Sequence, residues 1–433
     1  MRLSLPRTTS YDLPLLACVL VLLAIGLAMV YSASGIRALE TLDEPRYFLV
    51  QQSAWAALGL VGMAIAARID YHRYRAVALP ALVIAVVLLV VVLIPGVGTQ
   101  VGGASRWLRL SSFVGVQPAE LAKLGLILYL SFWFASRRDE MGRWSVTVPF
   151  LAITSVLVGL VVAEPDLGTA IVIVATAFAM YFVAGARLLE FAALALLAAV
   201  GVASLALVQP YRLQRVLTFL DPWSDPRGSG FQTIQSLYGL VLGGPFGEGL
   251  GAGKEKFGYL PAAYTDSIFA VLGNELGLLG TLSVVFLFLF LAFKGIRIAL
   301  RAPDTAGALL ATGVTAWLAF QAWLNMAVVA SLVPMTGITL PFISYGGSSL
   351  CVSLVAVGIL LNVGRQNGGV FAPADPRPRG PKIAVRRASL SGTPHRWRDR
   401  WARQPAPRRR GGSAGGGAGR SSPLRGWSSR PRG

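Results

Sequence analysis

The feature that most limits the possible folds is a succession of long apolar segments between residues 13 and 363, with few charges inside them. A helix needs about 20 apolar residues to cross the roughly 30 Å of hydrocarbon in a bilayer. With 55% hydrophobic residues, the chain predicts an all-α polytopic membrane protein with about ten transmembrane helices. The expected spans are 14–32, 49–67, 77–94, 118–135, 146–163, 169–183, 188–208, 267–293, 306–333 and 346–362.

Basic residues alternate between the two sides of these spans. The loops after the second, fourth and eighth spans are basic, whereas the loop 334–345 has no charge. Since cytoplasmic loops carry the excess of Lys and Arg, both termini are predicted to be cytoplasmic. Three parts follow: a short N-terminal segment 1–13, a membrane domain 14–363 with one large extracytoplasmic loop at 209–265, and a cytoplasmic tail 364–433. Aromatic side chains in the large loop predict an ordered cap.

The tail 364–433 is rich in Pro, Gly, Ser and Arg and holds roughly +15 of the formal net charge of +19. It lacks the apolar residues that a core needs, so it is expected to be disordered. Such a segment fits anionic lipid on the inner leaflet. Arg/Gly tracts also bind nucleic acid or acidic proteins, but no specific nucleic-acid partner is expected here.

Several kinds of chemistry are excluded by what the chain lacks. Cys18 and Cys351 both fall inside spans, which argues against a disulfide framework or a thiolate metal site. The only histidines, His72 and His395, lie in cytoplasmic segments, so a catalytic triad at the outer face is not expected. The glycine-rich run 247–254 is not a phosphate loop, because Glu255 stands where Ser or Thr is needed.

Five carboxylates lie inside or at the lips of the spans: Glu120, Glu164, Asp166, Asp266 and Glu275. An ionised group at the bilayer centre costs at least about 2.5 kcal/mol, so these acids are expected to face a cavity and to function there. Asp266 is either the cap of a helix or a functional acid. Glu275 lies two turns deeper, and Lys123 is one candidate partner for its charge.

Two of these acids allow opposing interpretations. Glu120 and Lys123 share a helix face, so they form either a self-satisfied ion pair or the wall of a cavity for an anionic head group. Asp166 is either a simple helix cap or, with Glu164, an oxygen-ligand site for a divalent cation, Mg²⁺ or Mn²⁺.

Motifs that follow one another over residues 12–365 resemble the SEDS family, which comprises FtsW, RodA and SpoVE. They are Arg106-Trp107, the run 117–123 (Gln-Pro-Ala-Glu-Leu-Ala-Lys), the run 164–169 (Glu-Pro-Asp-Leu-Gly-Thr), Asp221-Pro222-Trp223 and the run 340–349. The resemblance implies a peptidoglycan glycosyltransferase of the bacterial cytoplasmic membrane. It implies polymerisation of lipid II at the outer face, with a class B penicillin-binding protein and other division proteins as partners.

The resemblance also implies roles for single residues. Asp266 matches the essential aspartate of the family and is expected to be the general base. The reaction also needs positive charge for the departing pyrophosphate, and the candidates for it in this sequence are Arg106, Arg109, Lys123, Arg212 and Arg215. Glu120, Thr265, Glu275 and Ser344 are further candidates for substrate binding, and Glu164 and Asp166 for a metal.

The chain departs from the family pattern close to Asp266. Ala262 stands where the family usually has Glu, Tyr264 where it has His and Ser267 where it has Phe; Asn274 replaces the first acid of a Glu-Glu pair. Thr339 is more typical of the division member FtsW than of the elongation member RodA. The alternatives left open are an elongation role, a lipid II flippase that depends on the deeper charges, and a scaffold that recruits division partners through the tail.

Overall fold

The structure is a computed structural model that describes residues 11–101, 104–109, 115–253 and 260–366. The chain divides into two compact units, 1–373 and 374–433, and the predicted disordered tail lies almost wholly outside the described residues. Ten long helices form the first unit. They are α1 (Leu13–Leu42), α2 (Tyr47–Arg68), α3 (Tyr74–Leu93), α4 (Pro118–Ser136), α5 (Trp144–Ala163), α6 (Leu167–Val183), α7 (Leu188–Val208), α10 (Ile268–Leu300), α11 (Thr305–Val329) and α12 (Gly347–Gln366).

Within the described residues, nine helices are long and apolar enough to cross a membrane, and α6 is a tenth apolar helix of 17 residues. The prediction of a polytopic helical membrane protein is confirmed. The centre of the bundle is made by α4, α11 and α12, whose apolar windows are mostly buried, while the window of α7 contains no buried residue and packs only one side against the core. Its remaining sides are apolar and exposed, which fits a surface covered by lipid.

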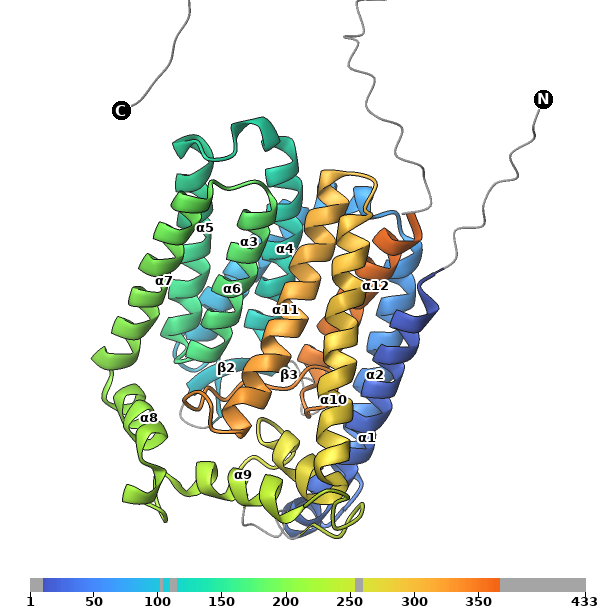
Figure 1. Ribbon diagram of the computed structural model, residues 1–433, viewed down its shortest axis with the longest axis vertical. Helices are drawn as coiled ribbons and strands as arrows, with labels where there is room; N and C mark the ends of the chain where they lie inside the picture. The colour runs from blue at the N-terminus through green and yellow to red at the C-terminus, as the bar shows by residue number, and fades with distance from the viewer. Residues whose placement is uncertain (1–10, 102–103, 110–114, 254–259, 367–433) are drawn as a thin grey trace, which may run out of the picture. The chain divides into compact units, whose positions relative to one another are not determined.

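The large loop 209–265 was expected to form an ordered cap, and its described part contains helices at one end of the bundle. The loop contains α8 (Pro210–Leu220), a short 3-10 helix (Pro222–Ser224) and α9 (Phe231–Leu242). Figure 1 shows α8 and α9 at the end of the bundle opposite to the start of α1 and the end of α12. The first and last described helical ends also meet, because Arg365 donates a hydrogen bond to the Tyr11 hydroxyl.

A small antiparallel sheet lies between α3 and α4, and the helical prediction missed it. It consists of β1 (Thr99–Val101), β2 (Ala104–Arg109) and β3 (Gly115–Val116), with β2 in the middle. The sequence could have indicated a β-hairpin here, because the Gly-Gly dipeptide 102–103 is typical of a tight hairpin turn. The sheet places Arg106 at the same end of the bundle as α8 and α9 (Figure 1).

Helix α10 is broken at Gly277, whose φ of 67° is outside the helical region. Beyond the break, Leu278 N–H donates to the carbonyl of Gly244 at 2.8 Å instead of to its own helix. The two backbones approach so closely that a Cβ on Gly277 would lie 2.3 Å from the Gly247 nitrogen. The glycine-rich run that begins at Gly247 therefore packs against the break in α10, which agrees with rejecting it as a phosphate loop.

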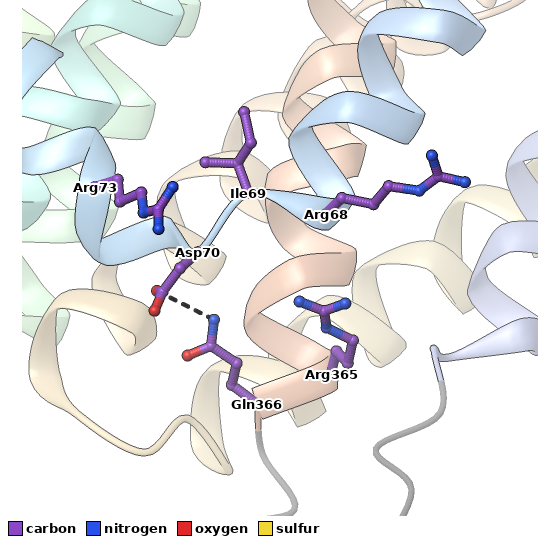
Figure 2. Close-up of a pocket in the computed structure, with 6 residues that line it drawn as sticks. All are labelled: Arg68, Ile69, Asp70, Arg73, Arg365 and Gln366. Carbon is purple, nitrogen blue, oxygen red and sulfur yellow. Dashed lines mark hydrogen bonds between the residues drawn. The ribbon is translucent and has the colours of Figure 1, made fainter.

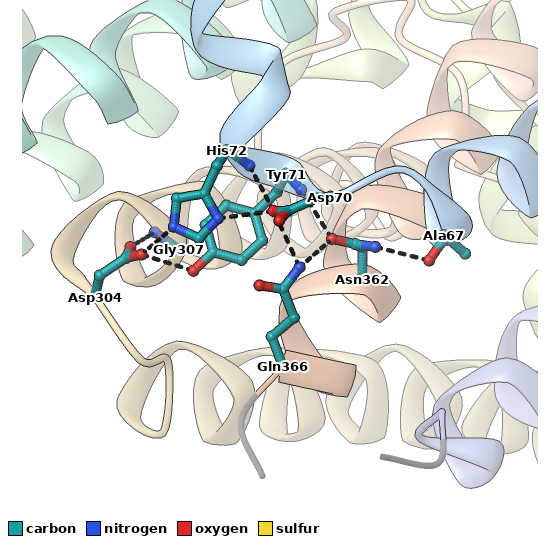
Figure 3. Close-up of polar contacts among 8 residues, drawn as sticks. All are labelled: Ala67, Asp70, Tyr71, His72, Asp304, Gly307, Asn362 and Gln366. Atoms are coloured by element: carbon teal, nitrogen blue, oxygen red, sulfur yellow. Dashed lines mark hydrogen bonds and ion pairs between the residues drawn. The ribbon is translucent and has the colours of Figure 1, made fainter. Parts of the chain in front are cut away.

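The opposite end of the bundle is held by a polar cluster that Figure 3 shows. The His72 imidazole lies between Asp70 and Asp304, at 2.7 Å from an oxygen of each. Tyr71 donates its hydroxyl to Asp304 and its backbone N–H to Asn362. The cluster joins the turn before α3, the start of α11 and the end of α12, so it fixes three segments that are far apart in sequence.

Candidate active site at the mouth of the bundle

Asp266 lies two residues before α10, at the end of the bundle that carries α8 and α9. Thr265 donates its hydroxyl to Asp266 Oδ1 at 3.0 Å. Burial raises the pKa of Asp266 above its usual value, although the Thr265 hydroxyl, Gln232 and the positive charge of Arg215 act in the opposite direction. A carboxylate with a raised pKa is a better proton acceptor than an ordinary exposed one.

Hydrogen bonds join the backbone around Asp266 to α11 and to the loop 330–346, which connects α11 to α12. Asn325 donates one hydrogen bond to the Asp266 carbonyl and one to the Ile338 carbonyl, both at 2.8 Å. Ser344 donates its hydroxyl to the Thr265 carbonyl and accepts the N–H of Leu340. The predicted site residues Thr265 and Ser344 therefore meet, and both act on the position of Asp266.

A cavity of about 280 Å³ lies beside this carboxylate, between α8, α9 and the segment 328–335. Arg215 and Gln232 line it, and both side chains also interact with Asp266. Arg215 donates to the Met335 carbonyl at 3.3 Å, and Gln232 donates to the Ser267 hydroxyl at 3.0 Å. A cavity with a guanidinium and amides on its walls, next to a carboxylate, suits a hydroxylated, negatively charged ligand.

Replacing Asn325 by leucine is expected to lower activity about tenfold and the free energy of unfolding by about 1–3 kcal/mol, because two backbone carbonyls lose their donor. The side chain is buried and of similar size, so little else changes. Thermal unfolding and turnover of the purified variant measure both effects. Trp323→Leu, on an exposed part of the same helix, is the control and should change neither.

Glu120 and Lys123 form a buried ion pair with a separation of 2.9 Å, as in the first of the two interpretations. Lys123 also donates to Gln321 at 2.7 Å and lies 4.9 Å from the centre of the Trp317 ring. Gln321 in turn donates to the Thr339 carbonyl at 3.0 Å. The pair thus supports the loop that faces Asp266.

Glu275 is fully buried near the break in α10, and Ser32 of α1 donates to both of its carboxylate oxygens, at 2.6 and 2.8 Å. Lys123, which the sequence offered as one candidate partner for Glu275, bonds instead to Glu120 and Gln321. Glu275 joins α1 to α10 beneath the candidate site.

Arg106 reaches from β2 to the start of α6, where its guanidinium donates to the backbone carbonyls of Glu164 and Pro165. Asp166 caps α6: it accepts the N–H and the hydroxyl of Thr169, and Gln117 also donates to it. Neither of the buried Glu164 oxygens accepts a hydrogen bond within the described part of the chain.

These carboxylates do not fit a divalent metal site by themselves. Asp166 has its oxygens occupied by hydrogen-bond donors, which leaves only Glu164 as a ligand. Among the described residues, no group of three or more His, Cys, Asp and Glu side chains is placed to hold a metal ion. The metal assignment to Glu164 and Asp166 stays a prediction, and no step below depends on it.

Burial and the nearby charge of Asp166 raise the pKa of Glu164 to about 8, although Arg106 acts against this shift. Between pH 5 and 8 the folded protein therefore holds a proton that the unfolded chain releases, so stability falls as the pH rises through this range. Glu164→Gln is expected to match the wild type in melting temperature at pH 5 and to exceed it by several degrees at pH 8.5. The exposed Glu248→Gln is the control, and parallel pH curves for wild type and Glu164→Gln would contradict the assignment.

The remaining predicted cations differ in their surroundings. Arg212 is buried and donates to the carbonyls of Val162 and Leu205, which fixes α8 to the ends of α5 and α7. Arg109 is exposed at the end of β2. Of the five candidate cations, Arg215 is the one that lines the cavity beside Asp266.

Three of the four departures from the family pattern have local explanations. Tyr264 packs its ring against Phe48 and Tyr345, with centroid distances of 4.9 and 5.6 Å. Ser267 accepts the hydrogen bond from Gln232. Ala262 has a φ of 53° and its carbonyl accepts the N–H of Thr265, so it forms the turn that leads to Asp266.

Sequence reasoning missed the amides that organise the site. Gln321 and Asn325 are four residues apart on α11 and therefore share a helix face. Two amides on one face of an otherwise apolar helix could have indicated a polar site there. Gln232 on α9 could not be found in this way, because its role depends on how the large loop folds over α10.

These features define a class of protein: a helical membrane protein with a carboxylate and a guanidinium beside a cavity at one mouth of the bundle. A family model described as cell cycle protein, covering FtsW, RodA and SpoVE, matches residues 13–368. The chain belongs to the FtsW/RodA/SpoVE family.

Named relatives agree with this membership. The chain is 42% identical to a probable peptidoglycan glycosyltransferase FtsW of Geobacter sp. (strain M18) over 84% of this chain and 99% of that protein. It is 44% identical to stage V sporulation protein E of Bacillus subtilis (strain 168), over 83% and 98% of the two chains.

Solved structures have the same fold. One, described as a peptidoglycan synthase complex that coordinates polymerization and crosslinking, contains a chain with a TM-score of 0.68 and 32% identity, over 83% of this chain and 98% of that one. The rod shape determining protein RodA of Thermus thermophilus has a TM-score of 0.62 and 28% identity, over 83% and 99%.

Proposed function

We propose that this chain is an FtsW-like peptidoglycan glycosyltransferase that polymerises lipid II at the outer face of the bacterial cytoplasmic membrane. The observation that carries the proposal is the site at Asp266: a carboxylate with a raised pKa, held by its backbone, that interacts with Arg215 and Gln232 on the wall of a cavity. Relatives that share 42–44% of their residues with this chain, over nearly their whole length, are named for this activity.

The reaction forms a bond between the 4-hydroxyl of an acceptor sugar and the anomeric carbon of a donor. Asp266 takes the hydroxyl proton as the oxygen attacks, and the lipid pyrophosphate leaves with the electron pair of the broken bond. An α-linked donor gives a β-linked product in one inversion, so no covalent sugar–enzyme intermediate is needed. One base and one source of positive charge are sufficient.

The leaving pyrophosphate gains negative charge as its bond breaks, so a fixed cation near it lowers the barrier. Arg215 is the best placed of the candidates, because it lines the cavity and interacts with Asp266. Arg109 is exposed at the same end of the bundle and is a second source of charge. Lys123 and Arg212 act through the scaffold instead, since each is buried and bonded to neighbouring residues.

The expected partner is a class B penicillin-binding protein that crosslinks the new strands. The solved complex described as coordinating polymerization and crosslinking supports a partner of this kind. The FtsW names of the relatives favour a role in division, together with other division proteins, over the elongation role of RodA.

Transport of lipid II is the competing activity, and it depends on mobile charges inside the membrane. Here the buried residues Glu120 and Lys123 form an ion pair with each other, and Lys123 also donates a hydrogen bond to Gln321. A buried, hydrogen-bonded pair is expensive to open, which favours polymerisation. The scaffold alternative rests on a tail that lies almost wholly outside the described residues.

Proteoliposomes with labelled lipid II separate these activities, using the full chain with and without its partner. Polymerisation is read from the length of the glycan products and transport from the exposure of the label. The proposal predicts polymer that requires Asp266. Translocation without polymer would favour the transporter, and neither activity would favour the scaffold.

A further inference from the structure

We propose that a second site, at the opposite end of the bundle from Asp266, binds the phosphate of an anionic phospholipid head group from the inner leaflet. The site is a cavity of about 630 Å³ whose charged lining consists of Arg68, Arg73, Arg365 and Asp70. The proposal does not depend on the glycosyltransferase activity.

Three separate segments build the cavity, as Figure 2 shows. Arg68 ends α2, Arg73 belongs to the turn before α3, and Arg365 lies in the last turn of α12. Helix dipoles account for basic residues at the ends of α2 and α12. They do not account for Arg73, which lies at the start of a helix, where a positive charge is unfavourable.

The guanidinium groups of the cavity have no acidic partners. In the part of the chain that the structure describes, the side chains of Arg68 and Arg73 form neither a hydrogen bond nor an ion pair. Arg365 bonds to the Tyr11 hydroxyl and lies over its ring, and both contacts are with a neutral group. Guanidinium groups bind phosphate oxygens through paired N–H donors, so three of them around one cavity suit a phosphate.

Asp70 limits the charge of the ligand. Hydrogen bonds from the backbone and ring of His72 lower the pKa of Asp70 to about 2, so its carboxylate is charged at neutral pH. A doubly charged inorganic phosphate meets more repulsion from this carboxylate than a singly charged phosphodiester does. Gln366 donates to both Asp70 and Asn362, so its amide holds the carboxylate in place at the edge of the cavity.

The position of the cavity points to a lipid and not to a soluble ligand. Arg68 and Arg365 end two membrane-spanning helices on the basic side, which is the level of inner-leaflet head groups. Among the described residues, Ile69 is the single apolar one in the lining, so these residues offer no ring for a nucleotide base to stack on. The turn is also held in place, because His72 bonds to both Asp70 and Asp304 (Figure 3).

The test uses the full chain in nanodiscs of equal parts phosphatidylglycerol and phosphatidylcholine, followed by native mass spectrometry in detergent. The wild type is expected to retain one phosphatidylglycerol. A triple variant, Arg68→Gln with Arg73→Gln and Arg365→Gln, is expected to lose at least fivefold of this occupancy. The control removes the same charge from exposed basic-side residues outside the cavity (Arg75→Gln, Arg143→Gln and Arg297→Gln) and should keep the lipid.

The single variant Arg73→Gln shows whether a loss of lipid could come from misfolding. This side chain is exposed and has no hydrogen-bond or ion-pair partner in the described structure, so its replacement should not disturb the fold. It is expected to lose at least twofold of the bound lipid at an unchanged melting temperature. Equal occupancy in wild type and triple variant would overturn the proposal. Displacement of the lipid by millimolar inorganic phosphate would also overturn it, in favour of a soluble phosphate as ligand.

Discussion

Asp266→Asn is expected to reduce glycan polymerisation at least about 100-fold, because an amide of the same shape cannot accept the proton of the attacking hydroxyl. The melting temperature should change little, since the bonds that hold this segment involve the backbone carbonyls of Thr265 and Asp266 and the side chains of Asn325 and Ser344. The measurement is the initial rate of product formation from labelled lipid II by the full chain with its partner.

The pH dependence gives this prediction a second readout. Since burial raises the pKa of Asp266, the wild-type rate should rise with pH until this carboxylate is fully ionised. The residual rate of the variant should not follow that rise. Glu248→Gln removes an exposed acid from the same large loop and should leave both rate and profile unchanged. A variant at Asp266 that keeps the wild-type rate and profile would show that this residue is not the base.

Lys123→Met is expected to be the most destabilising single change, at about 3–5 kcal/mol, because it leaves Glu120 buried without its partner. Gln321 keeps a donor from Trp317, so most of the loss belongs to the ion pair. Activity should fall as well, since this network supports the loop that faces Asp266. Thermal unfolding in detergent or nanodiscs measures the change.

A double variant that combines Lys123→Met with Glu120→Gln distinguishes the loss of the ion pair from the loss of packing around Lys123. Replacing both charges removes the uncompensated carboxylate, so the double variant should be clearly more stable than Lys123→Met alone. If the double variant is as unstable as the single one, the loss arises from packing around Lys123. If Lys123→Met is as stable as the wild type, the buried pair does not have the role described here.

Most of the fold was predictable because the bilayer imposes it. Apolar segments near 20 residues long have few alternatives to spanning helices, and all ten expected spans correspond to helices. What could not be predicted is where helices deviate from the simple pattern. The break at Gly277 depends on hydrogen bonds from a loop about thirty residues earlier, and no periodicity within α10 reveals it.

The site was predictable in part. Asp266 was found through the motif around it, and Thr265 and Ser344 were found for the same reason. Their contact could not be derived, because it joins segments 79 residues apart. The charge pairing was harder still. The spacing allowed the bond between Lys123 and Glu120, but it left Glu275 open as another partner. Only the packing of α4 against α11 shows that Lys123 also bonds to Gln321.

The measurement that tests the central claim most directly is the size distribution of glycan products made from labelled lipid II. The wild-type chain and Asp266→Asn are purified with the class B partner and compared at equal concentration and pH. The account predicts a ladder of long strands from the wild type and unreacted lipid II from the variant. Strands of equal length and yield from both proteins would contradict Asp266 as the base, and no strands from the wild type would contradict the proposed glycosyltransferase.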